Sequence, residues 1–351
     1  MIIFTNKVAE TLDEIVAKKA PSSVFVLVDK NTEALVLPLL QSQSATIENA
    51  EVIVTPVGDA SKNLDSLSRI WQTLADKGAT RHSLLINLGG GVVSDIGGFA
   101  AATFKRGMSF INVPTTLLGA VDAAVGGKTG INFNNLKNQI GVFRIADYVI
   151  ISSVFFNTLT GQELRSGYAE MIKHSLLKSK SAFRETLSRY PDEIGPDEML
   201  RLLEDSVLIK KKIVDEDPEE SGMRRLLNLG HTVGHAFESL SLMRRSPLAH
   251  GYAVAYGLLT ELVLSNRILS FPSSEISRLA IYINNVYPAF YFDCDDYPEL
   301  IRIMTADKKN KSPEQINFTL LHDIGHPALD CYASPEQIRE ALDITRDLLG
   351  I

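Results

Sequence analysis

Short apolar runs alternate with amphipathic stretches through the first 150 residues of the chain. Runs that end at Gly, Asp or Pro and are apolar throughout are typical of strands buried on both faces of a parallel sheet. Between two of them, Ser61–Lys77 has the spacing of a helix. This alternation predicts an open α/β sheet. The expected strands are Ser23–Val28, Glu51–Thr55, Ser83–Leu88, Ser109–Val113 and Tyr148–Ile151.

From about residue 160 the pattern becomes helical, with few strand signals. We therefore expect an α/β domain over residues 1–160 and a mostly α-helical domain over 161–351, with the boundary near Leu159–Gly161. In such a protein an active site is expected in the cleft between the domains. The expected helices are Gln162–Lys178, Ser181–Ser188, Asp197–Val214, Thr232–Ser241, Gly251–Leu269 and Pro335–Leu349.

A length of 351 residues also favours two domains, and 45% hydrophobic with 22% charged residues is ordinary for a globular protein. The net charge of −7 argues against nucleic acid as a partner but allows a local basic pocket. The only two cysteines, Cys294 and Cys331, cannot build a disulfide framework. The N-terminus has no apolar stretch long enough for a signal peptide or a membrane span. We expect a soluble, cytoplasmic protein.

A glycine-rich turn, Gly89–Gly91, follows the third expected strand. Its backbone could approach a pyrophosphate, and a helix expected to begin near Ser94 or Asp95 could hold the anion with its N–H groups. The pattern is GGGxxxD and not GxGxxG, and tight packing is an equally good reading. Asp29, at the end of an apolar run, suits a ribose hydroxyl, and Lys62 suits a phosphate. Taken singly, residues of these two kinds are more often helix caps or solvated charges.

The segment from residue 111 to 141 is dense in glycine and small residues, which suits a backbone folded closely around a ligand. Its apolar positions argue against a merely solvated loop. Paired hydroxyls, which could meet a cofactor, follow the fourth expected strand. The polar candidates are Thr115, Thr116, Asp122, Lys128, Lys137 and Asn138, with Arg106 nearby.

His231 and His235 are four positions apart in the sequence, which places both on one face of a helix. With Glu170 and His250 they offer the imidazoles and carboxylate of a zinc site with an open position. Spacing alone pairs His231 with His235 as ligands, although HxxxH also arises without a metal. The HExxH pattern is absent because position 232 is Thr. Basic residues suggesting a pocket for a phosphate and a carboxylate are Lys173, Lys210, Arg224 and Lys308.

Several ordered motifs together resemble the 3-dehydroquinate synthases over about residues 25–325. They are GGGVVSDIGGFAAATFKRG, VPTTLLGAVDAAVGGKTGIN, KNQIG, AEMIK, GMRRLLNLGHTVGHAFE and the HG of AHGYAV. The resemblance implies an N-terminal Rossmann-like α/β domain, a mostly α-helical C-terminal domain and a homodimer. Its implied cofactors are NAD and zinc, with cobalt as an alternative metal.

The resemblance also implies residue roles. The metal ligands would be Glu170, His231 and His250, which makes His235 a catalytic residue and not a ligand. Arg106 would reach the substrate phosphate of the partner subunit. NAD contacts would be Asp29, Asp59, Lys62, Gly90, Gly91, Val92, Val93, Ser94, Asp95, Thr115, Thr116, Lys128, Lys137, Phe155 and Thr158. Substrate contacts would be Asp122, Lys128, Asn138, Lys173, Lys210, Arg224, Asn228, His235 and Lys308.

The implied reaction converts 3-deoxy-D-arabino-heptulosonate 7-phosphate to 3-dehydroquinate and phosphate. It would run through transient oxidation by NAD, loss of phosphate, re-reduction and an intramolecular aldol closure. Another sugar-phosphate cyclase, a metal-dependent polyol dehydrogenase and an inactive NAD-binding scaffold are the alternatives. Departures from the family pattern are Asp59, Thr160–Glu163, Arg144–Ala146 and Tyr252, none of them an implied metal ligand.

Overall fold

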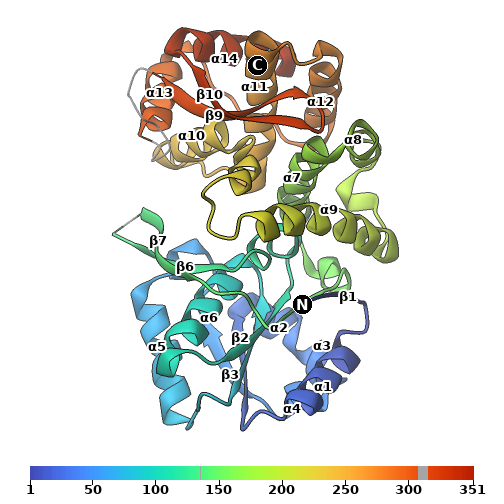
Figure 1. Cartoon of the computed structure of the whole chain (residues 1–351), viewed down its shortest axis with the longest axis vertical. Coiled ribbons are helices and arrows are strands. Elements are labelled where there is room, and N and C mark those ends of the chain that lie inside the picture. The colour runs from blue at the N-terminus through green and yellow to red at the C-terminus, as the bar shows by residue number, and fades with distance from the viewer. Residues whose placement is uncertain (135, 307–314) are drawn as a thin grey trace. The chain divides into compact units, whose positions relative to one another are not determined.

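The computed structural model describes residues 1–134, 136–306 and 315–351 (Figure 1). The chain forms two compact units, the first of residues Met1–Leu164 with Gly195–Lys211, the second of Arg165–Ile194 with Lys212–Ile351. Gly195–Lys211 therefore groups with the N-terminal sheet, although the sequence pattern assigned it to the helical part. One reason is the Ser153 hydroxyl, which donates to the Pro196 carbonyl at 2.7 Å.

Unit 1 is built on a six-stranded sheet in the order β1-β8-β5-β4-β2-β3, and all its neighbouring strands are parallel. Every residue of β4 is buried, as its continuous apolar run predicts. The five expected strands are present to within a residue or two, and β1 is an additional edge strand. The strands are β1 (Ile2–Phe4), β2 (Val24–Asp29), β3 (Glu51–Thr55), β4 (Leu84–Gly89), β5 (Ser109–Pro114) and β8 (Tyr148–Ile151).

Helices and turns connect these strands. The expected helix at Ser61–Lys77 is α5, Leu64–Asp76, and it starts later because the Asn63 side chain accepts from the Ser66 N–H as a cap. The other helices of unit 1 are α1 (Val8–Lys19), α2 (Lys30–Leu35), α3 (Leu37–Gln41), α4 (Ala45–Glu48), η1 (Asp59–Ser61), α6 (Gly91–Thr103), η2 (Phe104–Arg106), η3 (Gly119–Ala123), η4 (Val154–Thr158) and α9 (Pro196–Glu216) up to Lys211.

The strand order reverses at β2. From β2 the chain moves outward to β3 and then returns to β4 on the other side of β2. In open α/β sheets, ligands bind beyond the carboxyl ends of the strands at such a point. Asp29 ends β2 and Gly89 ends β4 there. The fold thus brings the acidic residue and the glycine-rich turn to one edge of the sheet.

The segment expected to fold closely around a ligand is a π-helical turn followed by an antiparallel hairpin. The turn is η3, and the hairpin pairs β6 (Lys128–Phe133) with β7 (Leu136–Phe143). In Figure 1 the hairpin lies along α6. Gly130 of β6 faces the backbone of β7. A Cβ on Gly130 would lie 2.4 Å from the Ile140 carbonyl oxygen, so the close pairing of these strands requires glycine.

Unit 2 is mostly α-helical, which confirms the expected fold class together with the α/β sheet of unit 1. Its centre is α11, buried without interruption from Gly251 to Ser265. A hairpin that was not expected, β9 (Ile316–Asp323) with β10 (His326–Ala333), packs on α11 through a Leu321 N–H bond to Ser265. The helices are α7 (Gly161–Lys178), α8 (Lys180–Leu187), η5 (Pro191–Glu193), η6 (Met223–Asn228), α10 (His231–Met243), α11 (His250–Leu269), α12 (Ser273–Val286), η7 (Cys294–Asp296), α13 (Tyr297–Thr305) and α14 (Pro335–Leu349).

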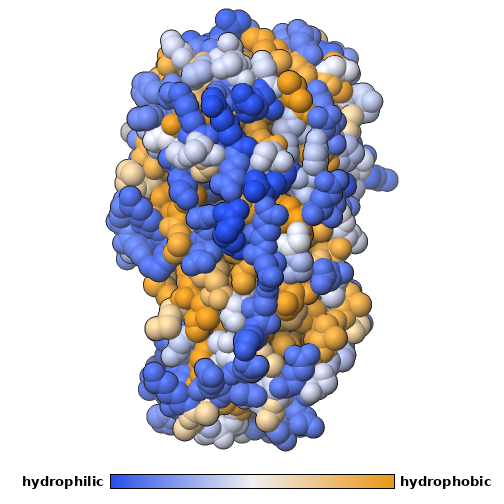
Figure 2. Space-filling model, turned by 90° about the vertical axis from the view of Figure 1, so that its right-hand side faces the viewer, coloured by the Kyte–Doolittle hydropathy of each residue, from blue (hydrophilic) through white to orange (hydrophobic). Residues whose placement is uncertain are grey.

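Hydrophobic and hydrophilic residues are interspersed on the molecular face drawn in Figure 2, as on most protein surfaces. Among the residues that the structure describes, no helix has the length and apolar content needed to cross a bilayer.

Candidate active site

In unit 2, glycines allow the backbones of three helices to approach one another closely. A Cβ on Gly251 of α11 would lie 1.9 Å from the Ser166 carbonyl oxygen of α7. A Cβ on Gly257 of α11 would lie 2.1 Å from the Gly230 carbonyl oxygen and 2.6 Å from the Gly234 nitrogen of α10. Larger residues would push these helices apart. The glycines therefore let side chains from α7, α10 and α11 meet.

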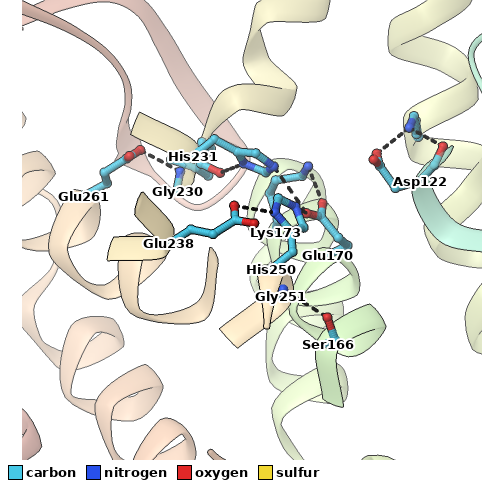
Figure 3. Close-up of polar contacts among 12 residues, drawn as sticks. Asp122, Ser166, Glu170, Lys173, Gly230, His231, Glu238, His250, Gly251 and Glu261 are labelled. Carbon is cyan, nitrogen blue, oxygen red and sulfur yellow. Dashed lines mark hydrogen bonds and ion pairs between the residues drawn. The ribbon is translucent and has the colours of Figure 1, made fainter. Parts of the chain in front are cut away.

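The three residues predicted as metal ligands converge on one point (Figure 3). The Nε2 atom of His231 lies 3.3 Å from Glu170 Oε1, and the Nε2 atom of His250 lies 3.6 Å from the same oxygen. Glu170 is fully buried, and its other oxygen forms an ion pair with the Lys173 ammonium. One carboxylate oxygen thus faces a cation of the protein and the other faces two imidazoles.

This donor set fits a divalent metal. Ligands about 2.0–2.1 Å from a tetrahedral zinc are separated from each other by roughly 3.3–3.4 Å, close to the two separations above. Glu170 Oε1 is buried and makes no well-formed hydrogen bond within the described residues, only the two imidazole contacts. A buried acceptor in that position is costly unless a cation or donor meets it. Two nitrogens and one oxygen leave a coordination position for a substrate oxygen.

Contacts on the far side of each imidazole orient its Nε2 toward Glu170. The Nδ1 of His231 lies 3.1 Å from the Leu229 carbonyl oxygen. The Nδ1 of His250 lies 3.4 Å from Glu238 Oε2. Partners of this kind fix the tautomer and the ring plane of metal-binding histidines. Glu238 was missed in the sequence because its partner lies twelve residues away on another helix.

A second group of possible donors shares His250. It consists of His235, Glu238 and His250, and the ring of His235 meets that of His231 edge-on with centroids 5.3 Å apart. Neither donor group of the described residues contains both His231 and His235. The pairing suggested by their spacing is therefore not favoured. His235 is exposed and lies beside the predicted ligands His231 and His250.

Burial and nearby charges shift the pKa values of the three predicted metal ligands in different directions. Burial raises the pKa of Glu170, but the Lys173 ammonium and His231 outweigh burial and hold this pKa well below its ordinary value. Burial and the Lys173 charge lower the pKa of His231. Burial would lower the pKa of His250 too, but hydrogen bonds with Glu170 and Glu238 raise it to about 10. A metal that binds His250 would displace this proton.

Arg224 and Asn228 lie just before α10, a few residues ahead of His231 in the sequence. Asp217 organises this loop, because its carboxylate accepts from the backbone N–H groups of Ser221, Gly222 and Arg224 at 2.7–3.0 Å. The buried Arg224 side chain donates to the Pro218 carbonyl at 2.6 Å. Asn228 ends η6. Lys308 lies outside the described residues.

In unit 1 the glycine-rich turn is tightly packed. A Cβ on Gly90 would lie 3.1 Å from the Thr116 side chain, and one on Gly91 would lie 3.0 Å from Ala123. Helix α6 starts at Gly91 and not at Ser94 or Asp95 as expected, with Gly90 as its cap residue. No side chain caps this helix start, which is formed by the closely packed Gly90 and Gly91. Thr115 is buried, and its N–H donates to the Gly89 carbonyl at 3.0 Å.

Two lysines of unit 1 hold predicted ligand-binding residues together. Lys62 is buried and donates to the carboxylate of Asp95 and to Asn138 Oδ1. Lys210 donates to the carboxylate of Asp122 and, at 2.6 Å, to its carbonyl oxygen. Burial raises the pKa of Asp95 to about 6, although Lys62 opposes that rise.

Other predicted cofactor contacts have structural roles or lie on the hairpin. Asp29 caps α2 by accepting from the Thr32 N–H at 2.8 Å, and Asp59 accepts from the Asn132 amide at 3.0 Å. The Ser94 hydroxyl is buried and has no hydrogen-bond partner among the described residues. Val92 and Val93 lie in the first turn of α6, Lys128 and Lys137 are exposed on β6 and β7, and Phe155 and Thr158 lie in η4.

Arg106 lies at the other end of the sheet, where η2 leads into the amino end of β5. It lines an open hollow of about 450 Å³ with Arg81, His82 and Arg144. No carboxylate lines the hollow within the described residues. Arg106 is thus in a basic environment but not beside the glycine-rich turn of its own sheet.

The chain matches two family models along most of its length. The model described as 3-dehydroquinate synthase N-terminal matches residues 52–166, and that described as 3-dehydroquinate synthase C-terminal matches residues 167–310. A 3-dehydroquinate synthase of Parabacteroides distasonis is 44% identical over 350 residues, which are 100% of this chain and 99% of that protein.

Solved structures share the fold at low sequence identity. A 2-deoxy-scyllo-inosose synthase complexed with carbaglucose-6-phosphate, NAD+ and Co2+ superposes with a TM-score of 0.86 at 20% identity, covering 99% of this chain and 96% of that chain. A 2-epi-5-epi-valiolone synthase of Streptomyces hygroscopicus with NAD+ and Zn2+ bound superposes with a TM-score of 0.81 at 22% identity, with the same coverage of both chains. Together with the whole-length identity above, the two family models establish that this chain belongs to the 3-dehydroquinate synthase family.

Proposed function

We propose that this protein is a 3-dehydroquinate synthase, a carbon–oxygen lyase that converts 3-deoxy-D-arabino-heptulosonate 7-phosphate to 3-dehydroquinate and phosphate in the shikimate pathway. The observation that carries the proposal is the 44% identity to a 3-dehydroquinate synthase over the whole chain. The convergence of Glu170, His231 and His250 supports it independently.

Zinc is the proposed metal, held by Glu170, His231 and His250, and NAD is the proposed cofactor at the carboxyl edge of the unit 1 sheet. When bound, NAD takes up and returns a hydride, and the metal acts as a Lewis acid on substrate oxygens. The position of Asp29 and Gly89–Gly91 at the strand-order reversal supports the cofactor assignment. The Ser94 hydroxyl, which is buried and has no hydrogen-bond partner among the described residues, supports it as well.

The cationic residues of the chain are proposed to bind the two anionic groups of the substrate. Lys128, Lys173, Lys210 and Arg224 bring positive charge to an overall acidic protein. Asp122 orients Lys210, and Glu170 orients Lys173, so these two ammonium groups are held in place before a substrate arrives. Groups held in this way stabilise developing negative charge without reorganising. Asn138, Asn228 and Lys308 are proposed as further substrate contacts.

His235 is proposed to move protons. Its imidazole is exposed and lies next to His231 and His250, so it can reach a substrate oxygen near the metal without being a ligand. Imidazole is a common general acid–base group, and the elimination and ring-closing steps require proton transfers.

A cytoplasmic homodimer is proposed, in which Arg106 serves the partner subunit. Arg106 precedes the six-residue strand β5, while the glycine-rich turn follows the carboxyl end of β4 beside it. A six-residue strand spans about 20 Å. Arg106 is therefore at the opposite edge of its own sheet from the proposed cofactor site, which favours a role in a second copy of the chain.

A substrate panel tests the proposed reaction. The protein, loaded with zinc and NAD, is given the heptulosonate phosphate, glucose 6-phosphate or sedoheptulose 7-phosphate, and phosphate release is measured. The proposal predicts release from the heptulosonate phosphate alone, because only this substrate presents the carboxylate that the cation set suits. Release from another sugar phosphate and none from the heptulosonate phosphate would instead identify a different sugar-phosphate cyclase.

A further inference from the structure

Helix α10 carries His231 and His235 but has no capping side chain of its own. Its cap residue is Gly230, in the left-handed conformation with φ of 80°. A Cβ at this position would lie 2.6 Å from the Leu258 side chain, so no residue with a capping side chain fits there. The free N–H groups at the start of a helix still need acceptors when they are buried.

A carboxylate from another helix supplies these acceptors. Glu261 of α11 is completely buried, and one of its oxygens accepts from the Gly230 N–H at 2.6 Å (Figure 3). Its other oxygen accepts from the Val233 N–H at 3.1 Å. The two N–H groups lie on either side of His231 in the chain. Charge-assisted bonds to a helix N-terminus are among the stronger hydrogen bonds of proteins.

Glu261 also lies in the right place to act on the geometry of the site. It is four residues after Gly257 and so lies on the same face of α11. Gly257 is a residue at which α11 closely approaches the backbone of Gly230 and Gly234. The glycine allows the helices to approach closely, and the carboxylate accepts hydrogen bonds from the backbone at the start of α10. Leu229, whose carbonyl oxygen contacts His231 Nδ1, directly precedes this turn.

We infer that Glu261 is a positioning residue, an interhelical cap that fixes the first turn of α10 and through it the His231 and His235 side chains. The inference rests on the proposed metal site. Sequence reasoning did not single it out, because a lone Glu in the apolar helix pattern of α11 gives no sign that its acceptors face the backbone of α10.

Metal affinity of the Glu261→Gln variant tests this inference. The amide matches the carboxylate in shape, but its NH2 group has to face one of the two N–H groups. Glu275→Gln is the matched control, because Glu275 is buried in the same unit but bonds to Arg184 and Arg278. Chelator competition and the cobalt absorption spectrum are measured on both variants without substrate, at a temperature where both are folded.

E261Q is expected to lower zinc and cobalt affinity by about 10–100-fold and to shift the cobalt spectrum, while E275Q leaves both unchanged. Unchanged affinity in E261Q, or an equal loss in E275Q, would overturn the inference. If the unmodified protein binds neither metal, the proposed metal site fails, and amide exchange then tests the cap by itself.

Amide hydrogen exchange in the unmodified protein also decides the matter if E261Q does not fold. Val233 and Val93 are both fully buried third residues of helices with a glycine cap, but no side chain caps α6. The inference predicts slower exchange at Val233, because only its N–H has a carboxylate acceptor. Equal exchange rates at the two valines would overturn it.

Discussion

In two residues of the site, Glu170 and His250, the two polar side-chain atoms each contact a different partner. Glu170 presents one oxygen to Lys173 and the other to the two imidazoles, and His250 presents Nδ1 to Glu238 and Nε2 to Glu170. The motifs of the sequence predicted which residues these would be. They could not predict Glu238 and Glu261 as supports, because their partners lie twelve and about thirty residues away and two of them are backbone groups.

Separate variants of the two neighbouring histidines test the assignment of roles. We expect His250→Ala to lose the bound metal, because it removes one of three protein ligands. We expect His235→Ala to keep the metal and to lower kcat by about 100-fold or more, as removal of a general acid–base group does. Metal content and turnover are measured on the same preparations. Metal loss in His235→Ala would restore the pairing of His231 with His235.

Asp217 offers a test through the pH dependence of stability. Its hydrogen bonds from the N–H groups of Arg224, Gly222 and Ser221 lower its pKa from 3.8 to about 2. A lowered pKa stabilises the folded state above pH 3.8, and this contribution is lost as the pH falls toward 2. Asp217→Asn should therefore be less stable than the unmodified protein at pH 7, and the gap should close in that window.

Urea unfolding across pH 2–7 measures this gap. Glu219→Gln, an exposed carboxylate in the same loop, is the control and should show no such convergence. Because Asp217 shapes the loop that carries Arg224, Asp217→Asn should also raise KM for the phosphorylated substrate. A gap that does not change with pH would contradict this account of the loop.

At the scale of elements, strands buried on both faces were predicted well because their apolar runs have no other stable environment. The hairpins β6–β7 and β9–β10 were not predicted. The first is exposed along β7 and dense in small residues, and the second is isolated from the main sheet. The start of α6 was placed too late, because the helix begins at the closely packed Gly90 and Gly91 without a capping side chain to mark its start.

The crossing of α10 and α11 predicts a strong effect of Gly257→Ala. The added methyl would meet backbone atoms at 2.1 and 2.6 Å, and backbone cannot move aside as a side chain can. We expect a loss of about 1–3 kcal/mol in the free energy of unfolding, with weaker metal binding. Gly195→Ala has no atom within 4 Å of the new methyl and is the control. Equal stability of the two variants would show that the helices tolerate separation.

At the scale of the whole molecule, we expect Arg106 to act in the partner subunit. The parallel sheet places it at the amino end of β5, opposite the edge with the glycine-rich turn. The family resemblance suggested a role in the partner subunit, but neither the sequence pattern nor one chain alone contains the second copy. The expected cleft between the two domains likewise stays a prediction.

Subunit mixing tests the action of Arg106 across subunits. Arg106→Ala and His235→Ala should each be nearly inactive. If Arg106 serves the partner, a dimer of one subunit of each kind has one intact site, and random mixing should recover about a quarter of full activity in a twofold-symmetric dimer. Mixing His235→Ala with His235→Gln is the control and should recover none. No recovery in the first mixture would place Arg106 in its own subunit's site.

The measurement that tests the proposed chemistry most directly counts turnovers per NAD. The zinc-loaded protein is given the heptulosonate phosphate in large excess over NAD, and phosphate, 3-dehydroquinate and NADH are followed together. A lyase that returns its hydride predicts equal amounts of phosphate and 3-dehydroquinate, far exceeding the NAD supplied, with no build-up of NADH. NADH that accumulates in step with substrate consumption, without phosphate release, would contradict the proposal and identify a dehydrogenase.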